Sequence, residues 1–305
     1  MRLLMLGAGA IGGYFGARLA AAGVEVTFLV RPARAERLAS DGLNVVSPMG
    51  DVSLAVKTIT EAREPFDVVL LSCKAYDLDS AVDAIAPAVG PGSLVLPLLN
   101  GARHYAVLDE RFGADRVLGG LAHIPVTMAG DGTIRHLGPL QRFTLGARSP
   151  GQVQACQALY AEISRGGFDP VLAGNIEQAM WEKFTLLAAF AGLTCLMRAP
   201  VGAIMAADDG EAIAEAFLAE CASVAAAQGF RPSEPALAEA RKLMMTRGSS
   251  GTASMLRDLE NGGRTEHDHV LGDMLARARA AGIAAPMLGV AYAHMQAYEA
   301  RRMAG

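Results

Sequence analysis

The chain has 305 residues, of which 52% are hydrophobic, and its 27 basic side chains nearly balance 31 acidic ones. This length suggests about two domains, and the composition excludes a disordered chain. Without a basic run or an acidic tail, the charge pattern argues against nucleic acid as a partner. The four cysteines are widely spaced, so we interpret them as buried thiols of a cytoplasmic protein.

Short apolar segments alternate with helical patterns in the first half of the chain. Strands are expected at 2–6, 24–30, 67–72 and 94–98, with helices at 14–22, 34–40 and 78–89. The strands are apolar throughout instead of alternating, which is typical of a parallel sheet covered on both faces. The order of elements predicts an α/β fold, in which an N-terminal Rossmann sheet is doubly wound.

The middle and the second half of the chain follow different patterns. Strands at 117–126, 133–137 and 142–145 predict a small antiparallel extension, and a helix at 152–164 and a strand at 169–172 follow it. Beyond Gly174 only helices are expected, at 175–197, 211–228, 234–247, 266–281 and 286–301. We therefore predict a dinucleotide-binding domain over 1–172 and an all-α domain over 173–305. The active site is expected in the cleft between them, outside the carboxyl ends of the strands.

Two apolar segments of the helical half bear on membranes and partners. The run 184–197 is shorter than a bilayer requires, so we expect a buried helix and no membrane contact. The alanine-rich helix face over 214–227 is interpreted as a helix-packing surface that contributes to a homodimer interface.

A glycine-rich loop lies between the first strand and the first helix. The run from Gly7 through Gly9, Ala10 and Ile11 to Gly12 matches the G-x-G-x-x-G pattern. Its glycines allow a tight turn, close approach of the backbone to a pyrophosphate, and close packing of helix on strand. The helix N-terminus then offers unpaired N–H groups to the phosphates. This context predicts a dinucleotide site.

The end of the second strand bears on the choice between NAD and NADP. An NAD enzyme usually carries an acidic residue there, which binds the ribose 2′-hydroxyl. Here the segment 26–35 holds Arg31 and Arg34 and no acid. Because guanidinium groups suit a 2′-phosphate, we predict NADP, with Arg31 as the main contact. A solvated helix face is the alternative for Arg34.

Taken in order, the motifs resemble those of the ketopantoate reductases (2-dehydropantoate 2-reductases) over essentially the whole chain. They are the glycine loop, Arg31, Cys73-Lys74-Ala75, Leu99-Asn100-Gly101, Met180-Trp181-Glu182-Lys183, and Ser254-Met255-Leu256-Arg257-Asp258 followed by Thr265-Glu266. The resemblance implies a Rossmann domain followed by a helical domain. It also implies reduction of 2-dehydropantoate to (R)-pantoate by NADPH, in pantothenate biosynthesis.

The resemblance also implies roles for single residues. Lys183 resembles the general acid, and Glu266 the carboxylate that positions this lysine or holds a substrate hydroxyl. Ser254 is similar to the residue that binds the substrate carboxylate. Lys74 and Asn100 match positions between cofactor and substrate, so they and Glu266 are also expected to contact the cofactor. Four of these residues have simpler alternatives: Lys183 as a surface lysine, Ser254 and Glu266 as helix caps, and Asn100 as part of a turn.

The sequence departs from the family pattern on the helix that follows Lys183. Asparagines are usual one and two turns later, whereas Leu187 and Ala191 stand there. Residues at these spacings share a helix face, so that face is apolar here. Asp77 likewise stands where a neutral amide is common. These changes leave the hydride chemistry in place and open a second reading, in which the substrate is a less hydroxylated 2-oxo acid.

Two other readings remain from the sequence. The cluster from Glu266 to His269 invites a metal site, but the two histidines are two positions apart and face different sides of a helix, so we expect no metal. The other is a non-catalytic dinucleotide-binding module. The presence of Lys183 and Glu266 argues against it.

Overall fold

The structure, a computed structural model, describes residues 1–304, which divide into two units. Residues 1–99 and 104–176 form the first unit, and residues 100–103 with those from 177 onward form the second. The helix α6 (Ile176–Met197) starts four positions beyond the boundary of 172 that the sequence suggested. The assignment of segment 100–103 to the second unit was not foreseen.

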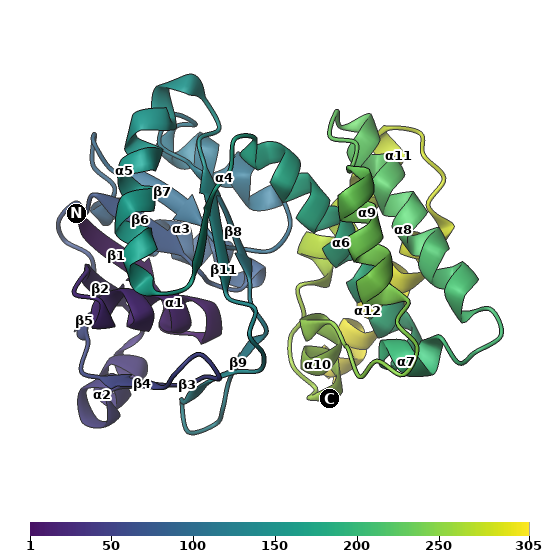
Figure 1. The fold of residues 1–305 in the computed structure, drawn as a ribbon, viewed down its shortest axis with the longest axis horizontal. Helices are drawn as coiled ribbons and strands as arrows, with labels where there is room; N and C mark the ends of the chain where they lie inside the picture. Colours follow the sequence, from purple (N-terminus) through teal and green to yellow (C-terminus); the bar gives the residue numbers. More distant parts are fainter. Residues whose placement is uncertain (305) are drawn as a thin grey trace. The chain divides into compact units, whose positions relative to one another are not determined.

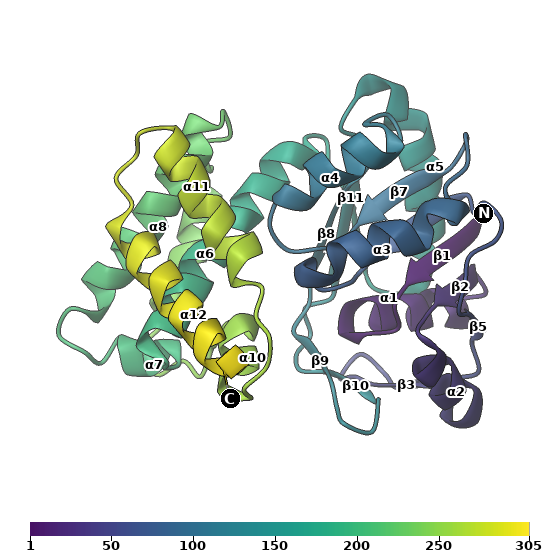
Figure 2. The same ribbon diagram turned by 180° about the vertical axis from the view of Figure 1, so that it is seen from behind.

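A five-stranded parallel sheet forms the centre of the first unit (Figure 1). Its strands stand in the order β5 (Lys57–Ile59), β2 (Glu25–Leu29), β1 (Arg2–Leu6), β6 (Val68–Leu71) and β7 (Leu94–Pro97). The helices of this unit are α1 (Ala10–Ala21), α2 (Pro32–Asp41), α3 (Leu78–Ile85), α4 (Arg103–Phe112) and α5 (Val153–Ile163). Helix α5 lies in front of the sheet in Figure 1, and α3 lies in front of it in Figure 2. The predicted Rossmann sheet with helices on both faces is confirmed.

Two smaller sheets complete the first unit. One has the order β4 (Val52–Leu54), β3 (Leu43–Val46), β10 (Ile134–His136) and β9 (Val126–Met128). The other has the order β12 (Asp169–Leu172), β11 (Arg142–Gly146) and β8 (Gly119–His123). The predicted strands do pair in antiparallel fashion, β9 with β10 and β8 with β11. They belong to two sheets instead of one extension, however, and each sheet also contains a parallel pair, β10 with β3 and β11 with β12.

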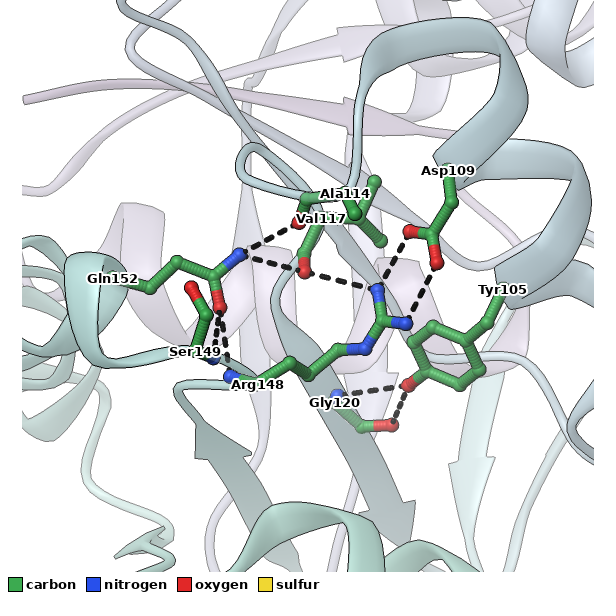
Figure 3. A network of polar contacts seen from close by, with 8 residues as sticks. All are labelled: Tyr105, Asp109, Ala114, Val117, Gly120, Arg148, Ser149 and Gln152. Atoms are coloured by element: carbon green, nitrogen blue, oxygen red, sulfur yellow. Dashed lines mark hydrogen bonds and ion pairs between the residues drawn. The ribbon is translucent and has the colours of Figure 1, made fainter.

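A polar network ties α4 to the β11–α5 connection (Figure 3). The Arg148 guanidinium donates two hydrogen bonds of 2.7 Å to the Asp109 carboxylate and lies 4.8 Å from the Tyr105 ring centroid. The Gln152 side chain accepts from the Arg148 backbone N–H at 2.7 Å and donates to the Val117 carbonyl at 3.0 Å. Helix α4 begins at Arg103, the last residue of segment 100–103, and this network fixes the part of α4 that belongs to the first unit.

The second unit is helical. Its elements are α6, α7 (Val201–Ile204), α8 (Gly210–Ala227), α9 (Glu234–Met244), α10 (Ser254–Glu260), the π-helical turn Asp268–Gly272, α11 (Asp273–Ala280) and α12 (Pro286–Ala304). Helix α6 forms much of the core: Ala188 and Leu193 are fully buried, as are Phe217 of α8 and Met274 of α11. The predicted all-α half is confirmed.

Helix α6 differs from the sequence-based expectation in its length. With 22 residues it is long and apolar enough to cross a membrane by length and composition, and 61% of its most apolar stretch is buried inside the structure. The short length of the run 184–197 does not describe the whole helix, because α6 extends N-terminally through residues 176–183, where apolar and polar side chains are mixed. The expectation of a buried helix is confirmed.

Candidate functional site

The glycine loop lies at the carboxyl end of the central strand β1. Gly7 has φ +87°, a conformation that favours glycine, and its N–H donates to the Leu29 carbonyl. A Cβ on Gly12 would stand 2.9 Å from the Gly7 carbonyl oxygen and would overlap the Ser72 hydroxyl. A Cβ on Gly9, by contrast, would meet nothing within 4 Å. The turn and the close packing thus require Gly7 and Gly12, whereas the space in front of Gly9 is open.

The N-terminus of α1 has the properties of an anion site. Gly9 is the N-cap residue and supplies no side-chain bond, and the first turn contains no acidic residue. Regular helical bonding starts with the Gly13 N–H, which donates to the Gly9 carbonyl at 2.8 Å. The backbone N–H groups of Ala10 and Ile11 precede it and therefore have no carbonyl within the helix. A pyrophosphate fits this arrangement of orphan donors and helix dipole.

The sheet order reverses beside this loop. Strand β1 pairs with β2 on one side and with β6 on the other. In such sheets the crevice at the reversal point, at the carboxyl ends of the strands, is the usual place for a ligand. Lys74 follows β6 there: it is partly buried and its carbonyl accepts from the Asp77 N–H at 2.9 Å. The loop and Lys74 are thus brought to the same edge of the sheet.

The two arginines that follow β2 have different surroundings. Arg31 precedes α2, its side chain is 81% exposed, and its Nη2 lies 3.3 Å from Oδ2 of Asp77. Arg34 is partly buried and donates to the Ala8 and Gly132 carbonyls at 3.1 and 3.3 Å. Burial, with Arg37 nearby, lowers the pKa of Arg34. The interpretation of Arg34 as a solvated helix face is therefore wrong, since this side chain holds the glycine loop by its backbone.

Lys183 and Asn100 come together in the second unit, although 83 positions separate them. The Lys183 ammonium donates to Oδ1 of Asn100 at 3.4 Å. Burial lowers the pKa of Lys183 from 10.5 to about 8, and the negative charge of Glu266 raises it in part. Glu266 is itself buried, with 8% of its surface exposed. A buried ammonium beside an amide and a carboxylate can hold a proton and release it near neutral pH.

His269 joins this group and was not predicted as one of its members. Burial lowers the pKa of His269, which Glu266 and Asp273 raise in part. Gly101 has φ +82°, and a Cβ there would lie 2.8 Å from Cδ2 of the His269 ring. The histidine thus packs closely on the Asn100–Gly101 turn. In the sequence it was visible only as part of a metal-like cluster.

The backbone before Glu266 is held from helix α12. The Glu299 carboxylate accepts from the N–H and the hydroxyl of Thr265, at 2.8 and 2.9 Å, and from Arg302 at 2.8 Å. Burial raises the pKa of Glu299, but these bonds outweigh burial and the net effect is a lowered pKa. Glu299 stays ionised at neutral pH, and its bonds fix the backbone from which Glu266 extends.

Ser254 and the face beyond Lys183 complete the predicted residues. Ser254 is the first residue of α10 and is partly buried; its N-cap is Ala253. Ala191 is 1% exposed and Leu187 packs against the core of the second unit, so the face that continues from Lys183 is apolar. Among residues 1–304 no group of three or more His, Cys, Asp and Glu side chains has the arrangement of a metal site.

Comparison with known proteins covers nearly the whole chain. Residues 3–150 match the family model described as ketopantoate reductase PanE/ApbA, and residues 175–299 match the model of its C-terminal part. The "uncharacterized oxidoreductase YkpB" of Bacillus subtilis is 38% identical, with 99% of this chain and 100% of that protein covered. The 2-dehydropantoate 2-reductase of Halobacterium salinarum is 31% identical, with 94% and 95% covered.

Solved structures share the fold. The crystal structure of a PanE/ApbA family ketopantoate reductase from Ralstonia eutropha superimposes with a TM-score of 0.88 at 29% identity. The match covers 99% of this chain and 100% of that one. Both halves of the fold therefore have counterparts in that enzyme, in the same order.

Proposed function

Because the chain belongs to the ketopantoate reductase family and is thus an oxidoreductase acting on a keto or CH–OH group, we propose that it reduces 2-dehydropantoate to (R)-pantoate with NADPH. The family assignment sets aside the non-catalytic module that the sequence left open. The substrate, the cofactor and the role of each residue are our proposals.

The first unit supports a nicotinamide dinucleotide as cofactor. The open space at Gly9 and the orphan N–H groups of Ala10 and Ile11 suit a pyrophosphate, with Gly7 and Gly12 shaping the turn. Arg31, exposed after β2, suits a 2′-phosphate, and this favours NADPH. Lys74 lies at the same edge and is assigned to the cofactor and the substrate. When bound, the reduced nicotinamide supplies the hydride for the keto carbon.

The second unit supports the proton chemistry. The observation that carries the proposal is the Lys183 ammonium, which donates to Asn100 and whose pKa is lowered by burial and raised in part by Glu266. As the keto carbon is reduced, negative charge develops on its oxygen. Lys183 stabilises this charge and donates its proton to the oxygen, which becomes the hydroxyl of the product. Glu266 keeps the lysine protonated at neutral pH, because its charge opposes the effect of burial on the pKa. Asn100 holds the ammonium in place.

The substrate carboxylate is assigned to Ser254, which opens α10. A hydroxyl at the start of a helix can donate to a carboxylate, and the helix dipole favours the anion there. This assignment rests on the match of the motif that begins at Ser254.

Leu187 and Ala191 favour a second candidate substrate, a less hydroxylated 2-oxo acid. Both side chains are apolar and packed in the unit, so they offer no partner for a substrate hydroxyl. A site that binds a hydroxyl gains discrimination from the polar groups that pair with it, and the face beyond Lys183 has none at these positions. The chemistry at the keto group is the same for both candidates.

A panel of 2-oxo acids with NADPH and NADH separates the candidates. The proposal predicts oxidation of NADPH with 2-dehydropantoate, at a higher kcat/KM than with 2-oxo acids that lack its hydroxyl. A higher kcat/KM on the unhydroxylated acids would instead assign the second candidate. Leu187→Asn is the matching variant, since it places an amide on the partly buried position and should increase kcat/KM for the hydroxylated acid selectively.

A further inference from the structure

Arg31 and Asp77 form an ion pair at the place assigned to the 2′-phosphate. Nη2 of Arg31 lies 3.3 Å from Oδ2 of Asp77, with side chains 81% and 36% exposed. Arg31 follows β2, whereas Asp77 follows β6, and these two strands flank β1. The carboxylate thus reaches the arginine from the opposite side of the glycine loop.

Asp77 occupies a helix-capping position without capping the helix. It is the N-cap residue of α3, where an aspartate normally accepts a bond from the N–H of the second or third helical residue. Its side chain makes no such bond, and the Ser80 hydroxyl donates to its backbone carbonyl instead. The carboxylate is instead paired with Arg31. The Asp77 side chain is therefore oriented toward Arg31 and does not cap α3.

We propose that Asp77 determines cofactor selectivity by competing with the 2′-phosphate for Arg31, which narrows the preference for NADPH over NADH. This inference rests on the cofactor assignment proposed above. A carboxylate paired with the guanidinium occupies donors that a phosphate would use, and it repels a phosphate that approaches. NADH carries no 2′-phosphate, so its binding is not opposed in this way.

The exposure of the pair sets the size of the effect. Because exposed ion pairs contribute little free energy, a phosphate with two negative charges can displace Asp77 from Arg31. Breaking the ion pair reduces the net binding free energy of that phosphate. Removal of the carboxylate charge should tighten binding of a 2′-phosphorylated ligand about threefold to tenfold at low ionic strength, with a smaller effect at high salt. A purely structural ion pair would leave the ratio of the two affinities unchanged.

The test is calorimetric binding of two cofactor fragments, adenosine 2′,5′-bisphosphate and 5′-AMP, to the full chain. The variants are Asp77→Asn, Arg31→Ala and their combination. Asp79→Asn is the matched control, since it removes the same charge two residues further along, from an exposed side chain in the first turn of α3. Binding of NADPH and NADH, and the unfolding free energy of each variant, are measured alongside.

Asp77→Asn should bind the bisphosphate more tightly, while its affinity for 5′-AMP changes less than about twofold. Asp79→Asn should leave the ratio of the two affinities unchanged. In the Arg31→Ala background the gain should vanish, because both side chains act on one phosphate. An equal change for both fragments, or none, would overturn the role of Asp77 and leave the reductase proposal standing. If no fragment and no dinucleotide binds any variant or the unaltered chain, both proposals fail.

Discussion

The pKa of Lys183 gives a quantitative prediction for the pH dependence of the reaction. Burial lowers this pKa from 10.5 to about 8, even with Glu266 raising it in part. The difference corresponds to roughly 3 kcal/mol in favour of the neutral amine. A general acid must carry its proton, so reduction should proceed fully below pH 8 and decline above it. Oxidation of the alcohol needs the neutral amine, so its rate should rise with pH over the same range.

Glu266→Gln tests the cause of this pKa. Removing the carboxylate charge takes away the contribution that raises the pKa of Lys183, so the alkaline limb of kcat/KM should move to lower pH by about one to two pH units. Glu266→Asp keeps the negative charge, so the alkaline limb of kcat/KM should stay close to its position in the unaltered enzyme. Glu260→Gln, a change of an exposed acid at the end of α10, is the control and should leave the limb in place.

The assay can also follow the lysine directly. The chain has four lysines, Lys57, Lys74, Lys183 and Lys242, so NMR of protein with carbon-13-labelled lysine gives few signals. The signal that disappears in Lys183→Arg identifies Lys183. A midpoint near 10.5 for that signal, or a limb that moves upward in Glu266→Gln, would refute the reasoning.

Three further predictions concern packing and ion pairs. Gly12→Ala should lower the unfolding free energy in urea titrations by about 1–3 kcal/mol, because its Cβ would stand 2.9 Å from a backbone oxygen. It should also weaken NADPH binding measured by calorimetry. If both quantities were unchanged, the packing role of Gly12 would be contradicted. Gly101→Ala should lower Tm and kcat together, because residue 101 has φ +82°. Gly289→Ala should raise Tm slightly, because Gly289 lies in α12 with open space around it. Equal changes of Tm in the two variants would contradict the strain at Gly101. Asp109→Asn should lower the unfolding free energy by about 1–2 kcal/mol, because it removes the carboxylate partner of a partly buried arginine. The exposed Glu61→Gln should lower it by less than about 0.5 kcal/mol. Similar losses in the urea titrations of the two variants would contradict a stabilising role for the network of Figure 3.

The elements that were predicted from sequence are those whose signal is local and strong. Strand β1 has four consecutive apolar residues after Arg2, and β12 lies between clear turn residues; both have the predicted bounds. Strands β3, β4 and β5 were missed because each has only three or four residues, of which one or two are polar. Pairing between distant strands cannot be read from local pattern, which is why the parallel pairs β10–β3 and β11–β12 and the division into two small sheets were not predicted.

The same distinction applies to the candidate site: a contiguous motif was predicted from the sequence, whereas contacts between distant segments were not. The glycine loop is a contiguous motif with a mechanical reason for each glycine, so the sequence sufficed to identify it. The Lys183–Asn100 contact joins residues far apart in the chain, and only the family resemblance suggested that they act together. His269 packing on Gly101 and the Arg31–Asp77 pair were not foreseen, since each depends on how separate segments meet.

The central claim, that Lys183 is the general acid of an NADPH-dependent keto-acid reductase, is tested most directly by one comparison of rates. Oxidation of NADPH with 2-dehydropantoate is followed at pH 7 for the unaltered enzyme and for Lys183→Ala, with NADPH binding measured for both. The account predicts turnover by the unaltered enzyme and a loss of kcat of about a hundredfold or more in the variant, while NADPH still binds. Equal rates for the two proteins would contradict it.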